Sequence, residues 1–206
     1  RCDIPLSNPS LEKFEQNVED WWNAFCVSCR ELSNHIEISE VDGLAISNQR
    51  ETLAKLDGEG KAIYPATVWM DKRSVKEVED LNAAMGEGKI HELTGRPKDP
   101  CPCLYRVLWL KNHEREIFDK VKCFADVQAF LVKRLSGEFN TGWISSDPHG
   151  MFDIVNKCWS QEILQQLEID ENDKRLNEFF KIVKFNLSDH QFIFNTLQEI
   201  ENEKTQ

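Results

Sequence analysis

The fold of this chain is decided by two short stretches, Ser47-Asn48-Gln49-Arg50-Glu51-Thr52 and Val68-Trp69-Met70-Asp71-Lys72-Arg73. The residues that lead into the first stretch, 41–47, are mostly apolar and predict a buried strand. Between the two stretches, Asp57-Gly58-Glu59-Gly60 is a strong turn signal. We therefore expect a strand over 41–47, followed by a hairpin whose strands cover 52–56 and 66–70.

Helical periodicity of the apolar residues accounts for most of the remaining chain. Asn17 is a suitable N-cap for a helix over 18–32, where Trp21, Phe25 and Cys29 recur on one face. Further helices are expected over 75–85, 89–93, 104–113, 114–121, 127–135 and 159–167, with a short strand over 151–154. Strands near the start and helices after them predict α/β or α+β layers. The last residues, 171–206, contain no Gly or Pro and predict a helical tail of unclear origin behind a domain over 1–170.

The composition fits a soluble globular chain and excludes several classes of partner. The 206 residues are 40% hydrophobic and 30% charged, and their formal net charge of -11 opposes binding to nucleic acid. No apolar run approaches the roughly 20 residues that cross a bilayer, so we expect no membrane partner. Seven cysteines, an odd number, without a secretory signal predict reduced thiols and a cytoplasmic location. The sequence leaves a homo-oligomer open.

Two pairs of cysteines have spacings that raise the question of a zinc site. Cys26 and Cys29 form one pair, and Cys101 and Cys103 form the other, which together would supply four thiolates. Cys26 and Cys29 lie on an apolar helix face, however, where a free cysteine behaves as a small hydrophobic residue. We therefore expect no metal in this chain.

The end of the first stretch carries a pair of charged residues that could bind a polyol. Arg50 offers a rigid fork of donors and Glu51 offers two acceptor oxygens, so together they can bracket neighbouring hydroxyl groups. Strand ends of open α/β sheets are also where ligands bind. The alternative is an ordinary surface ion pair, and the residues alone leave both interpretations open.

The second stretch places an aromatic side chain next to charged residues. The face of Trp69 can cover the C–H groups of a sugar while polar neighbours bind its hydroxyls. The alternative is a core tryptophan followed by Asp71 at the start of a helix. These two interpretations also stay open on this segment alone.

The order and spacing of these stretches resemble the FGGY family of carbohydrate kinases, which includes glycerol kinases and xylulose kinases. The Asn-Gln-Arg-Glu-Thr string is close to the glycerol-kinase form, and the Trp69-x-Asp71-x-Arg73 pattern is common among sugar kinases. The resemblance covers about residues 12–170 and continues through Leu93-Thr94-Gly95, Val107-Leu108-Trp109-Leu110-Lys111-Asn112-His113, 124–137, Ser145-Ser146-Asp147 and 150–154. It implies the N-terminal, ribonuclease H-like domain of a sugar kinase with the actin-like ATPase fold, present incompletely and followed by the helical tail.

The resemblance also implies roles for particular residues. Residues that match Arg50 and Glu51 bind substrate hydroxyls, and the residue that matches Trp69 packs on the carbon chain of the substrate. Asp71 belongs to the same pattern and is counted with them, and Cys101 stands where glycerol kinases carry a hydroxyl-binding tyrosine. Cys103 and Arg106 depart from the family signature, and these departures leave the choice of sugar or polyol open.

The resemblance further implies ATP and magnesium as cofactors of the complete kinase. We recognise no Asp-x-Gly-Thr phosphate loop and no general-base aspartate in this sequence. We therefore expect neither cofactor to be held by this chain alone, and we expect it to supply the substrate-binding side and to be inactive by itself, with its catalytic residues unknown. The alternative is a truncated, non-catalytic protein that keeps the fold as a binding or scaffold module.

Overall fold

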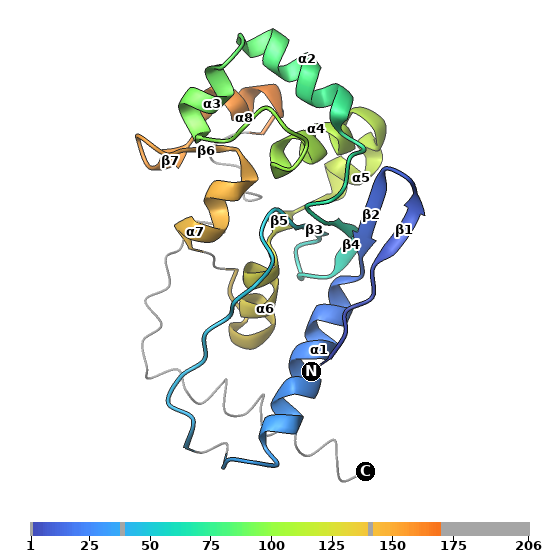
Figure 1. The fold of residues 1–206 in the computed structure, drawn as a ribbon, viewed down its shortest axis with the longest axis vertical. Helices are drawn as coiled ribbons and strands as arrows, with labels where there is room; N and C mark the ends of the chain where they lie inside the picture. The colour runs from blue at the N-terminus through green and yellow to red at the C-terminus, as the bar shows by residue number, and fades with distance from the viewer. Residues whose placement is uncertain (1, 38–39, 140–141, 170–206) are drawn as a thin grey trace.

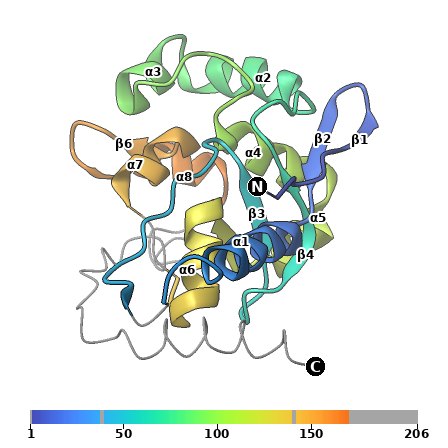
Figure 2. The same ribbon diagram turned by 60° about the horizontal axis from the view of Figure 1, so that its bottom comes forward.

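The computed structural model describes residues 2–37, 40–139 and 142–169, and within them a mixed α/β fold (Figure 1). An antiparallel sheet of five strands has the order β1-β2-β4-β3-β5. Helices α1 and α6 lie next to each other at one end of the sheet, and α2, α3 and α8 lie at the other end (Figures 1 and 2). The predicted tail over 171–206 falls outside the described residues.

The strands and helices have the following bounds. The strands are β1 Ser7–Ser10, β2 Lys13–Gln16, β3 Leu53–Leu56, β4 Ala62–Thr67, β5 Cys123–Ala125, β6 Phe152–Asp153 and β7 Cys158–Trp159. The helices are α1 Val18–Leu32, α2 Val75–Met85, α3 Lys89–Thr94, α4 Cys103–His113, α5 Arg115–Lys120, α6 Val127–Ser136, α7 Trp143–Ser146, the short 3-10 helix η2 Asp147–His149, and α8 Gln161–Gln166.

The first helix, α1, matches the sequence prediction because its cap and its buried face are both local signals. The Asn17 side chain accepts a hydrogen bond from the Glu19 amide at 3.1 Å, which satisfies one free donor of the first turn. Trp21 is buried, and its ring meets Phe130 of α6 edge to face at 5.7 Å. The buried face of α1 therefore packs against α6, although Trp21 and Phe130 are 109 residues apart in the sequence.

The hairpin of β3 and β4 is also confirmed, with one shift in its boundaries. Asp57 accepts from the amides of Glu59 and Lys61, both at 2.9 Å, and this closes the predicted turn. The return strand covers Ala62–Thr67, earlier than the expected 66–70. Trp69 therefore lies beyond the end of the strand, in a turn at the rim of the sheet.

The predicted strand over 41–47 is wrong. These residues form no regular secondary structure, and Leu44 is 47% exposed. A strand needs a neighbouring strand for its main-chain hydrogen bonds, and no described strand pairs with this segment. The sequence did not reveal β1, β2 or β5, because short strands of mixed polarity carry little periodic signal.

The remaining helices follow the predicted order with small shifts. Gly137 ends α6 in the left-handed region at φ 75°, where its amide bonds to Lys133, as the sequence predicts for a terminal glycine. Ser160 caps α8 by accepting from the Ile163 amide. The expected helix over 159–167 therefore begins two residues later, because residue 159 belongs to β7.

The hydrophobic core covers both faces of β3. All four residues of this strand are buried, and the strand alternates its side chains, so both of its faces are covered. Lys55 is one of them, and its Nζ donates to Leu53 O at 3.1 Å, Pro65 O at 3.1 Å and Thr67 Oγ1 at 2.8 Å. Burial holds the pKa of Lys55 well below its usual range.

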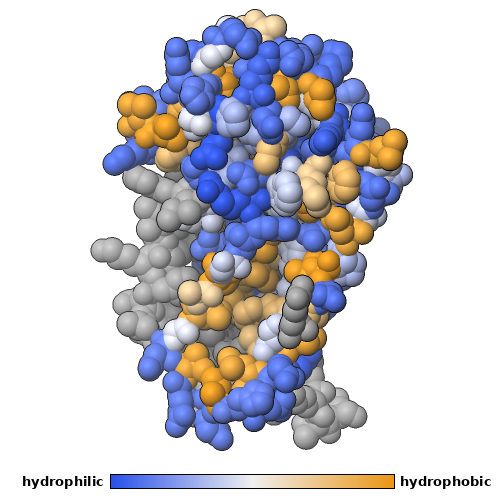
Figure 3. All heavy atoms as spheres, viewed as in Figure 1, coloured by the Kyte–Doolittle hydropathy of each residue, from blue (hydrophilic) through white to orange (hydrophobic). Residues whose placement is uncertain are grey.

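The surface carries a scatter of apolar side chains beside the polar ones (Figure 3). Val27 and Leu32 of α1, with Ile36 and Leu44 of the segment that follows, are each more than 40% exposed. Among the described residues, no helix is both long enough and apolar enough to cross a membrane.

Candidate functional site

Arg50 lies in a cluster of charged side chains drawn from three distant segments. Its Nη2 donates to Asp147 Oδ1 at 2.9 Å, and Arg96 Nη2 donates to the other oxygen of the same carboxylate. Arg96 Nη1 lies 3.8 Å from Glu51 Oε1. Arg50 remains 46% exposed, so part of its guanidinium fork still faces solvent and can donate to a ligand.

Glu51 adopts an unusual backbone conformation at this point. Its φ of 49° lies in the left-handed region, which a residue with a Cβ rarely occupies. Its carbonyl oxygen accepts a hydrogen bond from Arg106 Nη2 of α4. The buried side chain of Arg106 thus holds the backbone of Glu51. The Glu51 side chain is only 20% exposed and lies beside Arg96.

A pocket with a volume of about 500 Å³ opens beside Trp69, within the usual size range of small-molecule sites. It lies between the β1–β2 turn, the turn after β4, and the loop before α4, and its lining residues are Leu11, Phe14, Trp69, Met70, Lys72, Asp99, Pro100 and Cys101. Trp69 is 51% exposed, so its ring offers a face to a ligand and is not a core residue. Lys72 and Asp99 place charges at the edge of this apolar surface.

Cys101 faces this pocket as a neutral thiol. Partial burial, and then the negative charge of Glu51, raise the pKa of Cys101 to about 11. The thiol therefore stays protonated near neutral pH and is a weak donor. The pocket and the cluster around Arg50 are neighbours, because Arg106 donates both to Pro100 of the pocket and to Glu51 of the cluster.

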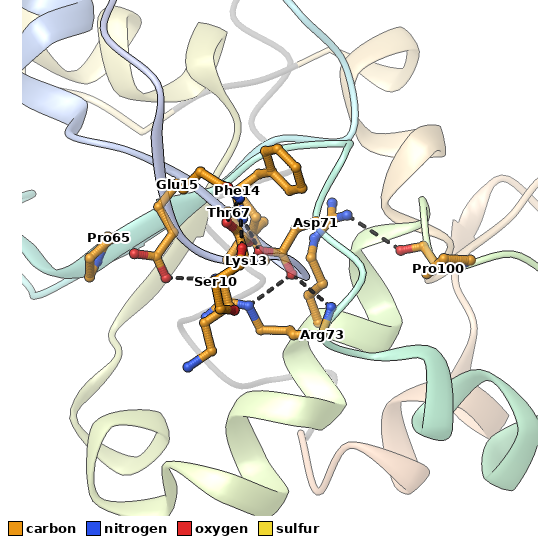
Figure 4. A network of polar contacts seen from close by, with 12 residues as sticks. Ser10, Lys13, Phe14, Glu15, Pro65, Thr67, Asp71, Arg73 and Pro100 are labelled. Atoms are coloured by element: carbon orange, nitrogen blue, oxygen red, sulfur yellow. Dashed lines mark hydrogen bonds and ion pairs between the residues drawn. The ribbon is translucent and has the colours of Figure 1, made fainter.

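Asp71 has a different position from the other candidate residues. It is fully buried, and its oxygens accept from the Phe14 amide at 2.8 Å and from Arg73 Nε at 2.8 Å and Nη2 at 2.7 Å (Figure 4). The same Nη2 of Arg73 also donates to Glu15 Oε1 at 2.6 Å. Both carboxylate oxygens are therefore taken, and Asp71 ties the turn that carries Trp69 to β2.

Beneath the cluster, Arg106 belongs to a buried polar group with Cys103, His149 and Asp126. Arg106 Nη2 donates to Cys103 Sγ at 3.3 Å, and His149 Nε2 lies 3.9 Å from Asp126 Oδ2. Burial opposes a charge on Cys103, but His149 and Arg106 outweigh it and lower the pKa of the thiol. Burial likewise opposes a charge on His149, but Cys103 and Asp126 raise the pKa of the imidazole to about 10.

The structure thus brings the expected site residues together in two adjoining parts. Trp69 and Cys101 line the pocket, whereas Arg50 and Glu51 belong to the charged cluster beside it. Asp71 lies in neither part, and its hydrogen bonds hold the turn that carries Trp69 of the pocket.

Three residues of this region received no role from the sequence. Arg96 follows the Leu-Thr-Gly string, Asp147 ends the Ser-Ser-Asp string, and Arg106 was noted only as a departure. Their position in motifs was a signal, but their convergence depends on tertiary packing. Among the described residues, no group of three or more His, Cys, Asp or Glu side chains could hold a metal ion.

Comparison with known proteins finds a family of carbohydrate kinases and individual sugar and polyol kinases. The family model described as "FGGY family of carbohydrate kinases, N-terminal domain" matches residues 1–184. The xylulose kinase of Staphylococcus xylosus is 31% identical over 166 residues, which are 80% of this chain and 34% of that protein. The glycerol kinase of Thermococcus kodakarensis is 28% identical over 176 residues, which are 82% of this chain and 35% of that protein.

Solved structures show the same fold. A ligand-bound xylulose kinase from Lactobacillus acidophilus has a TM-score of 0.78 at 22% identity, over 83% of this chain and 34% of that one. The Plasmodium falciparum glycerol kinase with ADP has a TM-score of 0.77 at 18% identity, over 91% of this chain and 40% of that one. These neighbours confirm the expected α/β, ribonuclease H-like fold of the actin-like ATPases.

The chain spans about a third of the length of the curated relatives it matches. The match of the family model covers most of the chain, and a relative above 30% identity covers four fifths of it. The chain therefore belongs to the FGGY family of carbohydrate kinases.

Proposed function

We propose that this chain forms the substrate-binding side of an ATP-dependent kinase that phosphorylates a hydroxyl group of a sugar or polyol. The substrate is a xylulose-like ketose or a glycerol-like polyol, the classes named among the relatives. The observation that carries the proposal is the half-exposed ring of Trp69 in a pocket adjoining Arg50 and Glu51.

Each candidate residue has a role in this proposal that follows from its chemistry. Trp69 covers the C–H face of the substrate, because an aromatic ring binds apolar C–H groups well. Arg50 donates hydrogen bonds to one hydroxyl, and the Glu51 carboxylate accepts from its neighbour. Cys101 contributes a neutral and compact wall to the pocket, and Asp71 positions the turn that carries Trp69.

We place neither ATP nor magnesium among the described residues. No group of three or more His, Cys, Asp or Glu side chains among them could hold a metal ion, and the sequence contains no glycine-rich phosphate loop. We therefore assign no step of phosphoryl transfer to these side chains. Their contribution is to bind and orient the accepting hydroxyl, which is a large part of catalysis in this class of reaction.

The chain covers only about a third of the length of its relatives and is expected to be inactive by itself. The proposal is therefore tested on the whole protein that the gene encodes. The protein is incubated with ATP, magnesium and single candidates: xylulose, glycerol, gluconate and related polyols. Mass spectrometry then looks for a product that is heavier by one phosphoryl group. We expect one ketose or polyol to be converted at a rate above all others. Failure to phosphorylate any of them, with the protein folded, contradicts the proposal.

A further inference from the structure

Arg106 links the two parts of the candidate site from beneath. It lies on α4 and is 1% exposed, so no substrate contacts it directly. Its Nη2 donates to the main-chain carbonyl of Glu51, and its Nη1 donates to the carbonyl of Pro100 at 3.4 Å. Pro100, the acceptor of the second bond, is labelled in Figure 4. Pro100 lines the pocket directly before Cys101, and the two acceptors lie 49 residues apart in the sequence.

The contact with Glu51 explains the strained backbone at that residue. A left-handed conformation in a residue with a Cβ persists only where the surroundings impose it. Here the conformation directs the Glu51 carbonyl into the guanidinium of Arg106. The bond to a charged donor offsets the strain and fixes the backbone from which the Glu51 carboxylate projects.

Two further observations describe the surroundings of the guanidinium, whose buried Nε has no hydrogen-bond partner among the described residues. A buried positive charge is costly unless polar partners surround it. Arg106 has the sulfur of Cys103 at 3.3 Å in addition to the two carbonyls. Gly150 packs against the start of the same helix, where an added Cβ would come within 2.9 Å of Pro102 and 3.0 Å of Leu104. Gly150 therefore lies in close contact with the start of the helix that carries Arg106.

We infer that Arg106 is a positioning residue that sets Glu51 and the Cys101 loop at a fixed separation, and so determines which substrates fit between them. This inference rests on the proposed function. Each of the two terminal nitrogens of the guanidinium donates to one loop, so a single side chain fixes the distance between the two loops. A lysine keeps the charge but has one nitrogen, and it cannot span both carbonyls in the same geometry.

Arg106→Lys tests the link without removing the buried charge. We expect hydrogen exchange to become faster by about tenfold or more at the amides of 48–52 and at those of Asp99 and Cys101, since the prolines at 100 and 102 carry no amide hydrogen, while β3 and α4 stay protected. Arg73→Lys is the matched control, because Arg73 is also buried but bonds to Asp71 and Glu15. It should leave residues 48–52 unchanged. Faster exchange in only one loop, or in neither, overturns the inference.

Kinetics of the gene-encoded protein supply the functional readout. Arg106→Lys should lower kcat/KM for the preferred sugar by about 10- to 100-fold and leave KM for ATP unchanged. Loosened loops with an unchanged kcat/KM for the sugar would contradict the positioning role. If the wild type phosphorylates no sugar, the proposed function fails, whereas the exchange experiment still decides whether Arg106 links the two loops.

Discussion

Arg50 and Asp147 are 97 residues apart in the sequence, yet Arg50 Nη2 lies 2.9 Å from Asp147 Oδ1. The same carboxylate accepts from Arg96, so Asp147 holds two arginines that come from different loops. This contact limits the positions that the half-exposed Arg50 can adopt. It turns a flexible surface side chain into one with a fixed direction beside the pocket.

Asp147→Asn should therefore weaken substrate binding more than it weakens the fold. The amide keeps the shape but removes the charge, so Arg50 and Arg96 lose their common partner. We expect the sugar KM to rise by about 3- to 10-fold with a small change in Tm, since partly exposed ion pairs contribute little to stability. Asp119→Asn, in the exposed pair with Arg115, is the control. Equal KM values for both variants would remove Asp147 from the site.

Asp71 should behave in the opposite way, as a residue of the fold. Asp71→Asn leaves the buried Arg73 with Glu15 as its remaining acidic partner. Breaking a buried ion pair on one side typically costs about 3–5 kcal/mol. Urea unfolding should show a loss of this order. The exposed pair of Lys76 and Asp80 supplies the control, because Asp80→Asn should leave the unfolding midpoint unchanged. A variant of Asp71 as stable as wild type would refute the assigned role.

The thiol of Cys101 should react slowly near neutral pH although it faces a pocket. Its pKa is raised to about 11, so the reactive thiolate is scarce at pH 7 and grows about tenfold per pH unit until that value. Mass spectrometry after iodoacetamide treatment should show this increase at Cys101, and a bound sugar should suppress it. Rapid labelling of Cys101 at pH 7 would show that burial and the charge of Glu51 do not raise the pKa of this thiol.

His149 should make the free energy of unfolding depend on pH. Its pKa is raised from 6.5 to about 10 by Cys103 and Asp126, against the opposing effect of burial, so the folded state favours the protonated imidazole. The stabilisation is complete below pH 6.5 and is lost as the pH rises through about 10. The lowered pKa of Cys103 acts in the other direction, with stabilisation present above pH 9 and lost as the pH falls.

The His149→Gln variant removes the charge of His149 and, with it, the largest of the causes that lower the pKa of Cys103. It should lose about 1–3 kcal/mol relative to wild type at pH 6, the scale of a charged hydrogen bond. The difference should shrink toward pH 10. Chemical unfolding at several pH values measures it, and a difference that is constant with pH would show that His149 does not titrate in the folded protein as inferred.

Local signals explain which parts of the fold the sequence predicted. Asn17 and the stripe around Trp21 define α1 within fifteen residues, and Asp57 closes its hairpin through its own neighbours. Residues 41–47 failed as a strand because a strand depends on a partner that local sequence does not specify. The same reason hid the role of Asp71, since Glu15 and Phe14 come from a strand that the sequence did not reveal.

The candidate site shows the same limit. Trp69, Arg50 and Glu51 were recognised because they stand in motifs with a distinct chemistry. The left-handed conformation of Glu51 and its bond to Arg106 could not be predicted, because they arise only when α4 packs beneath the loop. Chemistry was therefore visible in the sequence, whereas the positioning of that chemistry was not.

We propose that Arg50 binds a hydroxyl of the substrate beside Trp69, and removal of its side chain tests this role. The gene-encoded protein and its Arg50→Ala variant are compared by kcat/KM for the preferred sugar or polyol, at saturating ATP. Loss of a charged hydrogen bond predicts a decrease of about 1–3 kcal/mol in transition-state stabilisation, or roughly 5- to 150-fold in kcat/KM, with an unchanged Tm. An unchanged kcat/KM would show that Arg50 does not bind the substrate.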